Sequence, residues 1–326
     1  GAEDIELDEL YRTMGWLGEP TSAPWGRPNP AIGVRTTKDR IEELLFARRR
    51  DLFSSLSVLF FDTTSIYFEG EGGESLGQRG HSKDSRPDLK QMIVGAALDE
   101  QGRPVACKML PGNASDVKLF LPAIKALQAR FEAGSFCVVA DRGMISARTI
   151  EALEAPGSGI RYILGCRMRK QKEVRDEVLS GDTDKIQEVH FERKGSEETL
   201  RLEVREVRIE DRRYIVCFNP EKAKKDAADR LAIVESLKEK LKQGEKALVG
   251  NKGYRKYLKR EGEQAVFGID EQKLLEEARY DGLWVLRTNT DYSAEEVAFQ
   301  YKQLWMVEQV FRAVKSVLET RPIYHK

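Results

Sequence analysis

Two short apolar runs in this chain each end on an aspartate, and together they limit what the chain can fold into. VLFFD ends at Asp62 and FCVVAD ends at Asp141. Strand-like runs (SIYFE, QMIVGAALD, PVACKML) and an amphipathic helix (LFLPAIKALQARF) lie between them. This series of strands with one helix before FCVVAD, followed by ISARTIEALEA as a helix and RYILGC as a strand, predicts an α/β domain in which both carboxylates emerge at a sheet edge.

The sequence changes character after residue 166. Residues 167–218 are highly charged and partly alternating, which favours exposed antiparallel strands, and residues 221–242 carry apolar positions at helical spacing. The earlier pattern returns at YDGLWVLRTNT. We therefore expect an N-terminal helical region (1–56), a catalytic domain in two parts (57–165 and 281–326), and an inserted α+β domain between those parts (166–280).

The composition limits where the protein is located and which metals it binds, but it does not indicate a binding partner. The 326 residues include 54 Lys and Arg against 54 Asp and Glu, so any nucleic-acid surface must come from local patches. No apolar run is long enough to span a bilayer and no secretory leader is visible, so we expect a cytoplasmic location and no membrane partner. With three histidines and no C-x-x-C pair, the composition disfavours a zinc site.

A helix expected from about Ser293 to Thr320 carries an unusual inner face. Steps of four and three residues define its apolar stripe, which contains Val297, Tyr301, Leu304, Glu308, Phe311, Lys315 and Leu318. This spacing predicts that Glu308 and Lys315 point inward. A buried glutamate is costly unless it is paired or binds a metal. A Glu308–Lys315 ion pair is the structural alternative, although two helical turns separate the residues by ~10 Å.

Three carboxylates thus become candidates for one site. Singly, Asp62 and Asp141 are more typical of turns or caps, since aspartate is common where strands stop. Together with Glu308 they form an all-oxygen set that suits Mg²⁺ or Mn²⁺. Two such ions ~3.5–4 Å apart can activate water and stabilise the leaving oxygen of a phosphodiester.

Three segments resemble the catalytic core of DDE transposases from bacterial insertion sequences. FFDTTS, VVADRG and YKQLWMVEQVFRAVK are similar to the cut-and-paste group that has a domain inserted before its catalytic glutamate. Tyr301, Glu308 and Lys315 match the spacing of that group's helix signature. Leu304 stands where the group has an arginine, and Arg312, one turn after Glu308, is a candidate substitute. SKDSRPDLKQ and PGNASD also resemble family segments.

The resemblance implies a ribonuclease-H-like mixed five-stranded sheet flanked by helices, with the aspartates on its first and fourth strands. It implies that Asp62, Asp141 and Glu308 are the catalytic residues and the ligands of two Mg²⁺ or Mn²⁺ ions. The expected reaction is cleavage at transposon ends and transfer of the freed 3′-hydroxyl to target DNA. The implied partner is double-stranded DNA, held by a homodimer in the bacterial cytoplasm and associated with the nucleoid when bound.

Other side chains are candidates for DNA contact. The expected set is Tyr301, Lys315, Arg312, Arg142, Lys83 and Arg86. Lys83 and Arg86 lie in a polar loop for which DNA contact and simple solvation are equally good interpretations. Arg142 could meet a phosphate or pair locally. Trp284 is a candidate for stacking on a flipped base, against the alternative of ordinary packing.

Two alternative functions stay open. A catalytically inactive DNA-binding descendant would keep the fold, and a ribonuclease-H-like nuclease would cleave strands without joining them. The three intact carboxylates disfavour the first. Tyr301 and Lys315 at family spacing disfavour the second, because a simple nuclease has no need of them.

Overall fold

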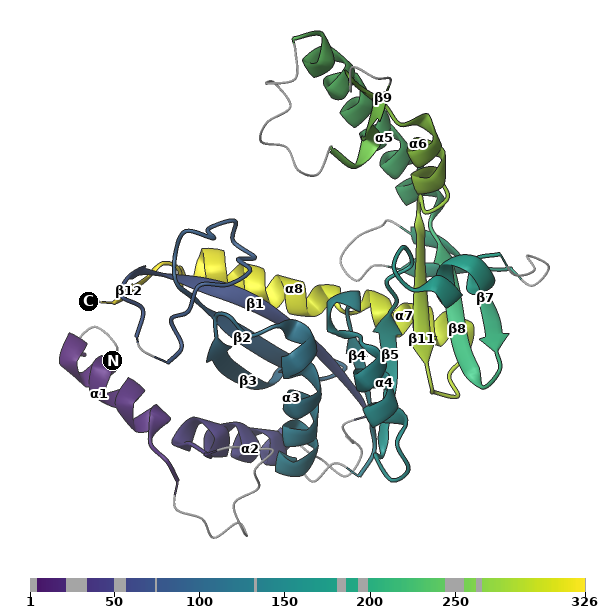
Figure 1. Ribbon diagram of the computed structural model, residues 1–326. Helices are drawn as coiled ribbons and strands as arrows, with labels where there is room; N and C mark the ends of the chain where they lie inside the picture. The colour runs from purple at the N-terminus through teal and green to yellow at the C-terminus, as the bar shows by residue number, and fades with distance from the viewer. Residues whose placement is uncertain are drawn as a thin grey trace. The chain divides into compact units, whose positions relative to one another are not determined.

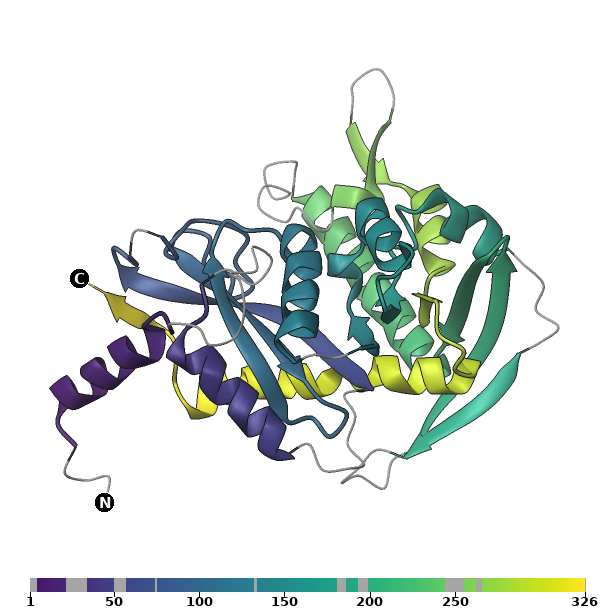
Figure 2. The same ribbon diagram turned by 90° about the horizontal axis from the view of Figure 1, so that it is seen from below.

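The chain divides into two units, each with its own core. A computed structural model describes residues 5–21, 34–49, 57–73, 75–131, 134–180, 186–192, 199–243, 255–261 and 266–325 (Figures 1 and 2). The first unit comprises Gly1–Cys166 and Arg287–Lys326, and the second comprises Arg167–Leu286. The sequence region expected as 1–56 falls in the first unit, and its residues 1–4, 22–33 and 50–56 lie outside the described residues.

A mixed sheet forms the centre of the first unit. Its strands are β1 (Val58–Gly70), β2 (Gln91–Leu98), β3 (Pro104–Pro111), β4 (Phe136–Ala140) and β5 (Ile160–Gly165), in the order β3-β2-β1-β4-β5. β1, β2 and β3 are antiparallel neighbours, whereas β1, β4 and β5 run parallel. The order and mixed directions of these strands confirm the expected ribonuclease-H-like mixed sheet.

One expectation about this sheet is wrong. VLFFD and SIYFE are not two strands that stop and restart, because β1 runs without a break through Asp62. Thr63 and Thr64 are buried and pair with β2. Their β-branched side chains suit extended backbone, so the polar pair continues the strand and forms no turn. Asp62 therefore lies inside a strand of 13 residues.

Helices cover both faces of this sheet, as Figures 1 and 2 show. On one face lie α3 (Asp116–Arg130) and α4 (Ala147–Glu154), and on the other lie α7 (Ala294–Lys302) and α8 (Trp305–Arg312). α1 (Leu7–Gly18) and α2 (Thr37–Arg49) precede the sheet. After α8 the chain continues as a π-helical segment, η5 (Ala313–Val317), and as β12 (Ile323–His325), which pairs in parallel with the end of β1.

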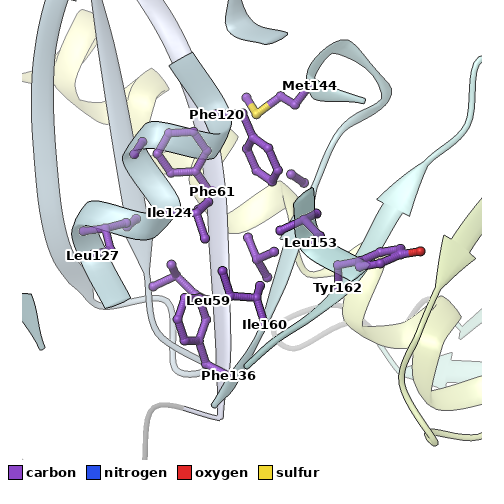
Figure 3. Close-up of a cluster of buried hydrophobic side chains, with 14 of the residues drawn as sticks. Leu59, Phe61, Phe120, Ile124, Leu127, Phe136, Met144, Leu153, Ile160 and Tyr162 are labelled. Carbon is purple, nitrogen blue, oxygen red and sulfur yellow. The ribbon is translucent and has the colours of Figure 1, made fainter. Parts of the chain in front are cut away.

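The core between the sheet and α3 fixes the orientation of β1. Leu59 and Phe61 pack against Phe120 and Ile124 in one buried cluster (Figure 3). Successive side chains of a strand point to opposite faces of the sheet. Asp62 consequently points away from α3, toward the face that α7 and α8 cover, whereas Thr63 shares the α3 face.

The expected long helix from Ser293 to Thr320 is interrupted. α7 ends at Lys302, and hydrogen bonds from Met306 N–H to Gln303 O (2.9 Å) and from Val307 N–H to Leu304 O (3.0 Å) form a tighter turn before α8. The chain changes again to π geometry at Ala313. A uniform period of 3.6 residues therefore predicts only part of the burial beyond Tyr301: Phe311 is buried as the stripe predicts, whereas Glu308 and Leu318 are exposed.

The second unit is α+β. It contains the antiparallel strands β6 (Gln187–Glu192), β7 (Thr199–Ile209) and β8 (Arg212–Phe218), preceded by the π segment η2 (Val174–Val178). A second part consists of α5 (Pro220–Lys242), η4 (Arg255–Tyr257), the hairpin of β9 (Leu258–Glu261) with β10 (Val266–Ile269), and α6 (Glu271–Ala278). Leu237 and Tyr257 are the buried centre of its core.

The second unit extends further along the sequence than the expected boundary at residue 280. β11 (Leu283–Thr288) crosses the division between the units, so Trp284 belongs to the second unit. Two hydrogen bonds attach Gly282 to the second unit: Asn219 N–H donates to Gly282 O (3.0 Å), and Gly282 N–H donates to Asp226 Oδ2 (2.9 Å).

No helix in the described ranges is long and apolar enough to cross a membrane.

Candidate active site

The register of two parallel strands brings Asp62 and Asp141 together. Phe61 of β1 lies opposite Ala140, the last residue of β4. Asp62 and Asp141 are the next residue of each chain segment and leave the paired region at the same end. The expectation that the two aspartates emerge at one place in the sheet agrees with this register, although β1 continues past the site.

Burial and neighbouring carboxylates raise the pKa of Asp62. Burial raises its pKa to about 6, opposed by the Lys83 ammonium and by a hydrogen bond from Thr63 N–H to Asp62 Oδ1 (2.7 Å). The negative charges of Asp141 and Asp116 also contribute to this raised pKa. Three carboxylates thus lie within electrostatic reach of one another with Lys83 as the cation that acts on Asp62.

Asp116 and Lys83 contact β1 at Thr63, the residue after Asp62. Thr63 Oγ1 donates to Asp116 Oδ1 (2.7 Å), and Lys83 Nζ donates to Thr63 O (2.7 Å) and lies 3.3 Å from Asp116 Oδ2. Sequence reasoning assigned no role to Asp116. The only available signal was the likeness of PGNASD to a family segment, which gives no contact across 53 residues.

Asp141 is held in place by a tyrosine from the opposite end of the chain. Asp141 is exposed, and its Oδ1 accepts a hydrogen bond from the Tyr301 hydroxyl (2.8 Å) at the end of α7. Burial, the negative charge of Asp141 and this hydrogen bond hold the pKa of Tyr301 well above its ordinary value. Tyr301, expected at DNA, thus contacts a candidate catalytic carboxylate.

The position of Glu308 differs from the expected one. Glu308 lies on α8, which packs against β1, but its side chain is exposed while Val307 and Phe311 are buried. The burial expected for Glu308 from the apolar stripe is therefore wrong, although Phe311 and Lys315, which the same stripe places inward, are largely buried. Among the residues that the structure describes, no three His, Cys, Asp or Glu side chains are grouped closely enough to hold a metal ion.

Lys315 is engaged by a buried carboxylate. Its Nζ lies 2.8 Å from Asp84 Oδ1, and Arg321 binds the same oxygen. The Asp84 side chain is 3% exposed and that of Lys315 is 11% exposed. Lys315 shows no contact with Glu308, so the Glu308–Lys315 ion pair considered from the sequence is wrong as well. The inward position expected for Lys315 agrees with its burial.

The other candidates for DNA contact differ in how far they are engaged. Arg86 binds Asp88 through two of its nitrogens and lies over the Tyr67 ring. Arg142 is exposed in the short helix η1 (Arg142–Met144), directly after Asp141, and Arg312 is exposed at the end of α8. Trp284 is half-buried, with Lys222 Nζ 6.0 Å from its ring centre.

This sheet, with acidic residues on β1 and directly after β4, defines the chain as a ribonuclease-H-like protein. The family model described as "Transposase DDE domain" matches residues 53–322. Because this match spans most of the chain, the chain belongs to the transposase DDE domain family. The resemblance seen in the three sequence segments is thereby confirmed.

The chain is also similar to one transposase of known structure, at low sequence identity. The chain is similar in structure to a piggyBac transposase, solved by cryo-electron microscopy as a synaptic complex with hairpin DNA, with a TM-score of 0.40 and 10% sequence identity. The likeness covers 96% of this chain and 55% of the piggyBac chain. No curated protein matches the sequence.

Proposed function

We propose that this chain is a DNA transposase that cleaves phosphodiester bonds at the ends of a mobile element and joins the freed 3′ ends to target DNA. Membership of the transposase DDE domain family supports this reaction class. The observation that carries the proposal is the strand register, in which Asp62 and Asp141 follow the paired residues Phe61 and Ala140 on adjacent parallel strands.

The two aspartates suit a divalent cation. Asp62 and Asp141 supply hard oxygen ligands, and a bound cation would favour the ionised form of Asp62, whose pKa is raised by burial and by nearby carboxylates. We propose that these two aspartates hold Mg²⁺ or Mn²⁺, with Glu308 as a third ligand from α8 and two ions in all. When bound, such ions activate an attacking oxygen and stabilise the leaving oxygen of a phosphodiester.

Two neighbours prepare these carboxylates. The Tyr301 hydroxyl donates to Asp141 Oδ1 and restricts the carboxylate to one orientation. Lys83 reduces the negative charge around Asp62 and fixes Thr63 through its carbonyl and hydroxyl oxygens. A carboxylate that is already oriented loses less side-chain freedom when it binds a ligand.

Double-stranded DNA is the proposed substrate and partner. Arg142 and Arg312 are exposed and are therefore the proposed phosphate contacts, whereas the Lys315 ammonium lies against Asp84. Two ends of an element must be held together for joining, so we propose a homodimer on DNA. The proposed setting is the bacterial cytoplasm, with association to the nucleoid through DNA.

The test is cleavage of a labelled duplex that carries the sequences flanking this coding region, with Mg²⁺ or Mn²⁺ added. Asp62→Asn and Asp141→Asn should reduce cleavage by at least about a thousandfold, because each removes a proposed metal ligand. Asp211→Asn, in the exposed turn between β7 and β8, is the matched control and should cleave normally. Glu308→Gln is compared in the same way with Glu295→Gln, which changes an exposed glutamate of α7.

The products separate the alternatives. Labelled strands joined to a target plasmid identify a transposase, whereas cleaved but unjoined strands identify a nuclease. Duplex binding without any cleavage identifies an inactive DNA-binding descendant. Undiminished cleavage by Asp62→Asn would overturn the proposed site.

A further inference from the structure

We infer that Lys83 and Asp84 form a positioning pair, here called the clamp. The clamp fixes the segment that follows α8, residues 313–321, against β1 close to Asp62. The inference rests on the proposed function, because it assigns the pair the task of holding Glu308 at a constant distance from Asp62. Lys83 contacts β1 and α3, and Asp84 contacts the chain on both sides of the turn that follows η5. Two consecutive residues of one loop thereby connect the two parts of the candidate site.

The Lys83 half of the pair is attached beside Asp62. Lys83 N–H donates to Ser65 Oγ (2.8 Å), and its ammonium donates to both oxygens of Thr63 at 2.7 Å. The same ammonium lies 3.3 Å from Asp116 Oδ2, at the start of α3. These contacts fix the backbone of residue 83 on β1, one and three residues beyond Asp62.

The Asp84 half is a buried carboxylate shared by two cations. Lys315 in η5 and Arg321 before β12 both bind Oδ1, while Oδ2 is buried and has no hydrogen-bond partner among the described residues. A buried charge without its cation is strongly unfavourable, so this contact resists separation. Asp84 therefore restrains the chain at two points, 315 and 321.

The segment that Asp84 restrains lies on the same helical stretch as Glu308. Lys315 lies two turns, ~10 Å, beyond Glu308 along a helix that remains hydrogen-bonded through α8 and η5. The loop that presents Lys83 and Asp84 is itself fixed, because Gln78 and Gln91 exchange two backbone hydrogen bonds of 3.0 Å. A Cβ on Gly112 would lie 1.9 Å from Gln91 O, so this loop packs backbone against backbone.

A direct role of Lys315 at a DNA phosphate is the competing explanation. A lysine that binds phosphate must present its ammonium to solvent, yet the Lys315 side chain is 11% exposed and already paired. Arg312, one turn earlier, is exposed, so a contact between Arg312 and a phosphate would leave the Lys315–Asp84 ion pair intact. The buried pair thus favours positioning over phosphate binding.

The first measurement asks whether the clamp exists, independently of any reaction. Hydrogen–deuterium exchange of the full chain is compared for wild type, Asp84→Asn and Asp211→Asn. Asp84→Asn should increase amide exchange in residues 305–318 by about tenfold or more, while β4 keeps its protection. Unchanged exchange in residues 305–318 would overturn the inference, whatever the catalytic result.

The second measurement asks whether the clamp positions the metal site. Mn²⁺ binding to the DNA-free protein is followed by electron paramagnetic resonance. Asp84→Asn and Lys315→Met should each weaken Mn²⁺ binding by about tenfold, as outer-shell changes do, and the double variant should lose no more than either single one. Lys315→Arg should restore most of the affinity, and Lys118→Met, on the exposed side of α3, is the matched control.

Binding of the labelled duplex at several salt concentrations excludes the competing role. We expect Lys315→Met to leave the salt dependence of DNA affinity unchanged. A decrease of about one in that slope, with Mn²⁺ affinity intact, would make Lys315 a phosphate ligand and overturn the inference. If Asp62→Asn binds Mn²⁺ as wild type does, the proposed function fails, and the exchange experiment still decides whether the clamp exists.

Discussion

At the scale of single residues, the site depends on a position without a side chain. Gly165 ends β5, and a Cβ built there would lie 2.5 Å from the Tyr301 hydroxyl and 3.0 Å from Arg142 N. Only glycine allows this close approach. The hydroxyl reaches Asp141 because β5 leaves space for it.

Gly165→Ala should therefore break the Tyr301–Asp141 hydrogen bond. We expect the variant to cleave the labelled duplex about 10–100-fold more slowly, the range typical when a group that orients a ligand is lost. Tyr301→Phe should have a similar effect, and the double variant should be no worse than either. Gly134→Ala is the control, since a Cβ there meets nothing within 4 Å. Additive losses in the double variant would show that Gly165 acts elsewhere.

The sequence predicts the aspartates of the site better than their surroundings. Asp62 and Asp141 were found because a charge directly after an apolar run is conspicuous. Asp116 was given no role and Lys83 was assigned to DNA contact, because their contacts with Thr63 join segments that no spacing rule connects. Glu308 was predicted to be buried because a regular period was assumed, and its exposure shows that this period does not hold at every position of an irregular helix.

At the scale of elements, α2 is attached to the first unit by charge. None of its side chains is fully buried, and the Arg130 guanidinium of α3 binds Asp39, Glu42 and Glu43 at 3.2, 2.8 and 3.0 Å. The Arg130 side chain is only 6% exposed. The ion-pair network, with Phe46 packed against the core, thus determines where α2 lies.

Arg130→Gln should release α2. Removing the cation leaves three carboxylates without their shared partner, and we expect a loss of about 3 kcal/mol in the free energy of unfolding, the lower end for a broken buried pair. Urea denaturation measures the loss, and limited proteolysis should cut first within residues 37–49. Arg48→Gln, on the exposed side of α2, should unfold like wild type. Equal stability of the two variants would contradict this account.

The same network predicts how stability responds to acid. Burial alone would raise the pKa of Asp39, but the Arg130 charge and the hydrogen bond from Thr36 N–H outweigh it and hold the pKa below its ordinary value of 3.8. A lowered pKa in the folded state stabilises the fold above the unfolded pKa, and this contribution disappears as pH falls through the folded pKa. The stability difference between wild type and Asp39→Asn should therefore shrink from about pH 6 to about pH 3. A constant difference across that range would exclude this role for Asp39.

Elements were predicted well where the local pattern was uniform. α3, α4, β4 and β5 agree with the sequence runs that predicted them, because each buries one face of a regular period. The prediction of one long helix from Ser293 onward failed at Gln303–Leu304, where the hydrogen bonds tighten. β1 was divided in the prediction because the charge of Asp62 was taken as the end of the first apolar run.

At the scale of the whole molecule, each of the two units contains a buried core of its own. Phe120 is at the centre of one, and Leu237 is at the centre of the other. We therefore expect more than one thermal transition, with a calorimetric enthalpy that exceeds the van't Hoff enthalpy.

Phe120→Ala should lower one transition and Leu237→Ala the other. Each substitution removes a fully packed side chain, at a cost of about 2–5 kcal/mol to the unit that contains it. Differential scanning calorimetry of the full chain assigns the transitions. If either variant shifts both transitions equally, the two units unfold as one.

The length of β1 has a consequence for solubility. On the side away from β2, β1 pairs with β4 over Val58–Phe61 and with β12 over Phe68–Gly70, and no described strand pairs with the intervening residues on that side. Such an open stretch of strand is a template for pairing with another chain. Lys83 donates to Thr63 O within it, and a charge at that position opposes intermolecular pairing. We therefore expect this lysine, which also contacts the candidate site, to disfavour aggregation through that stretch of β1.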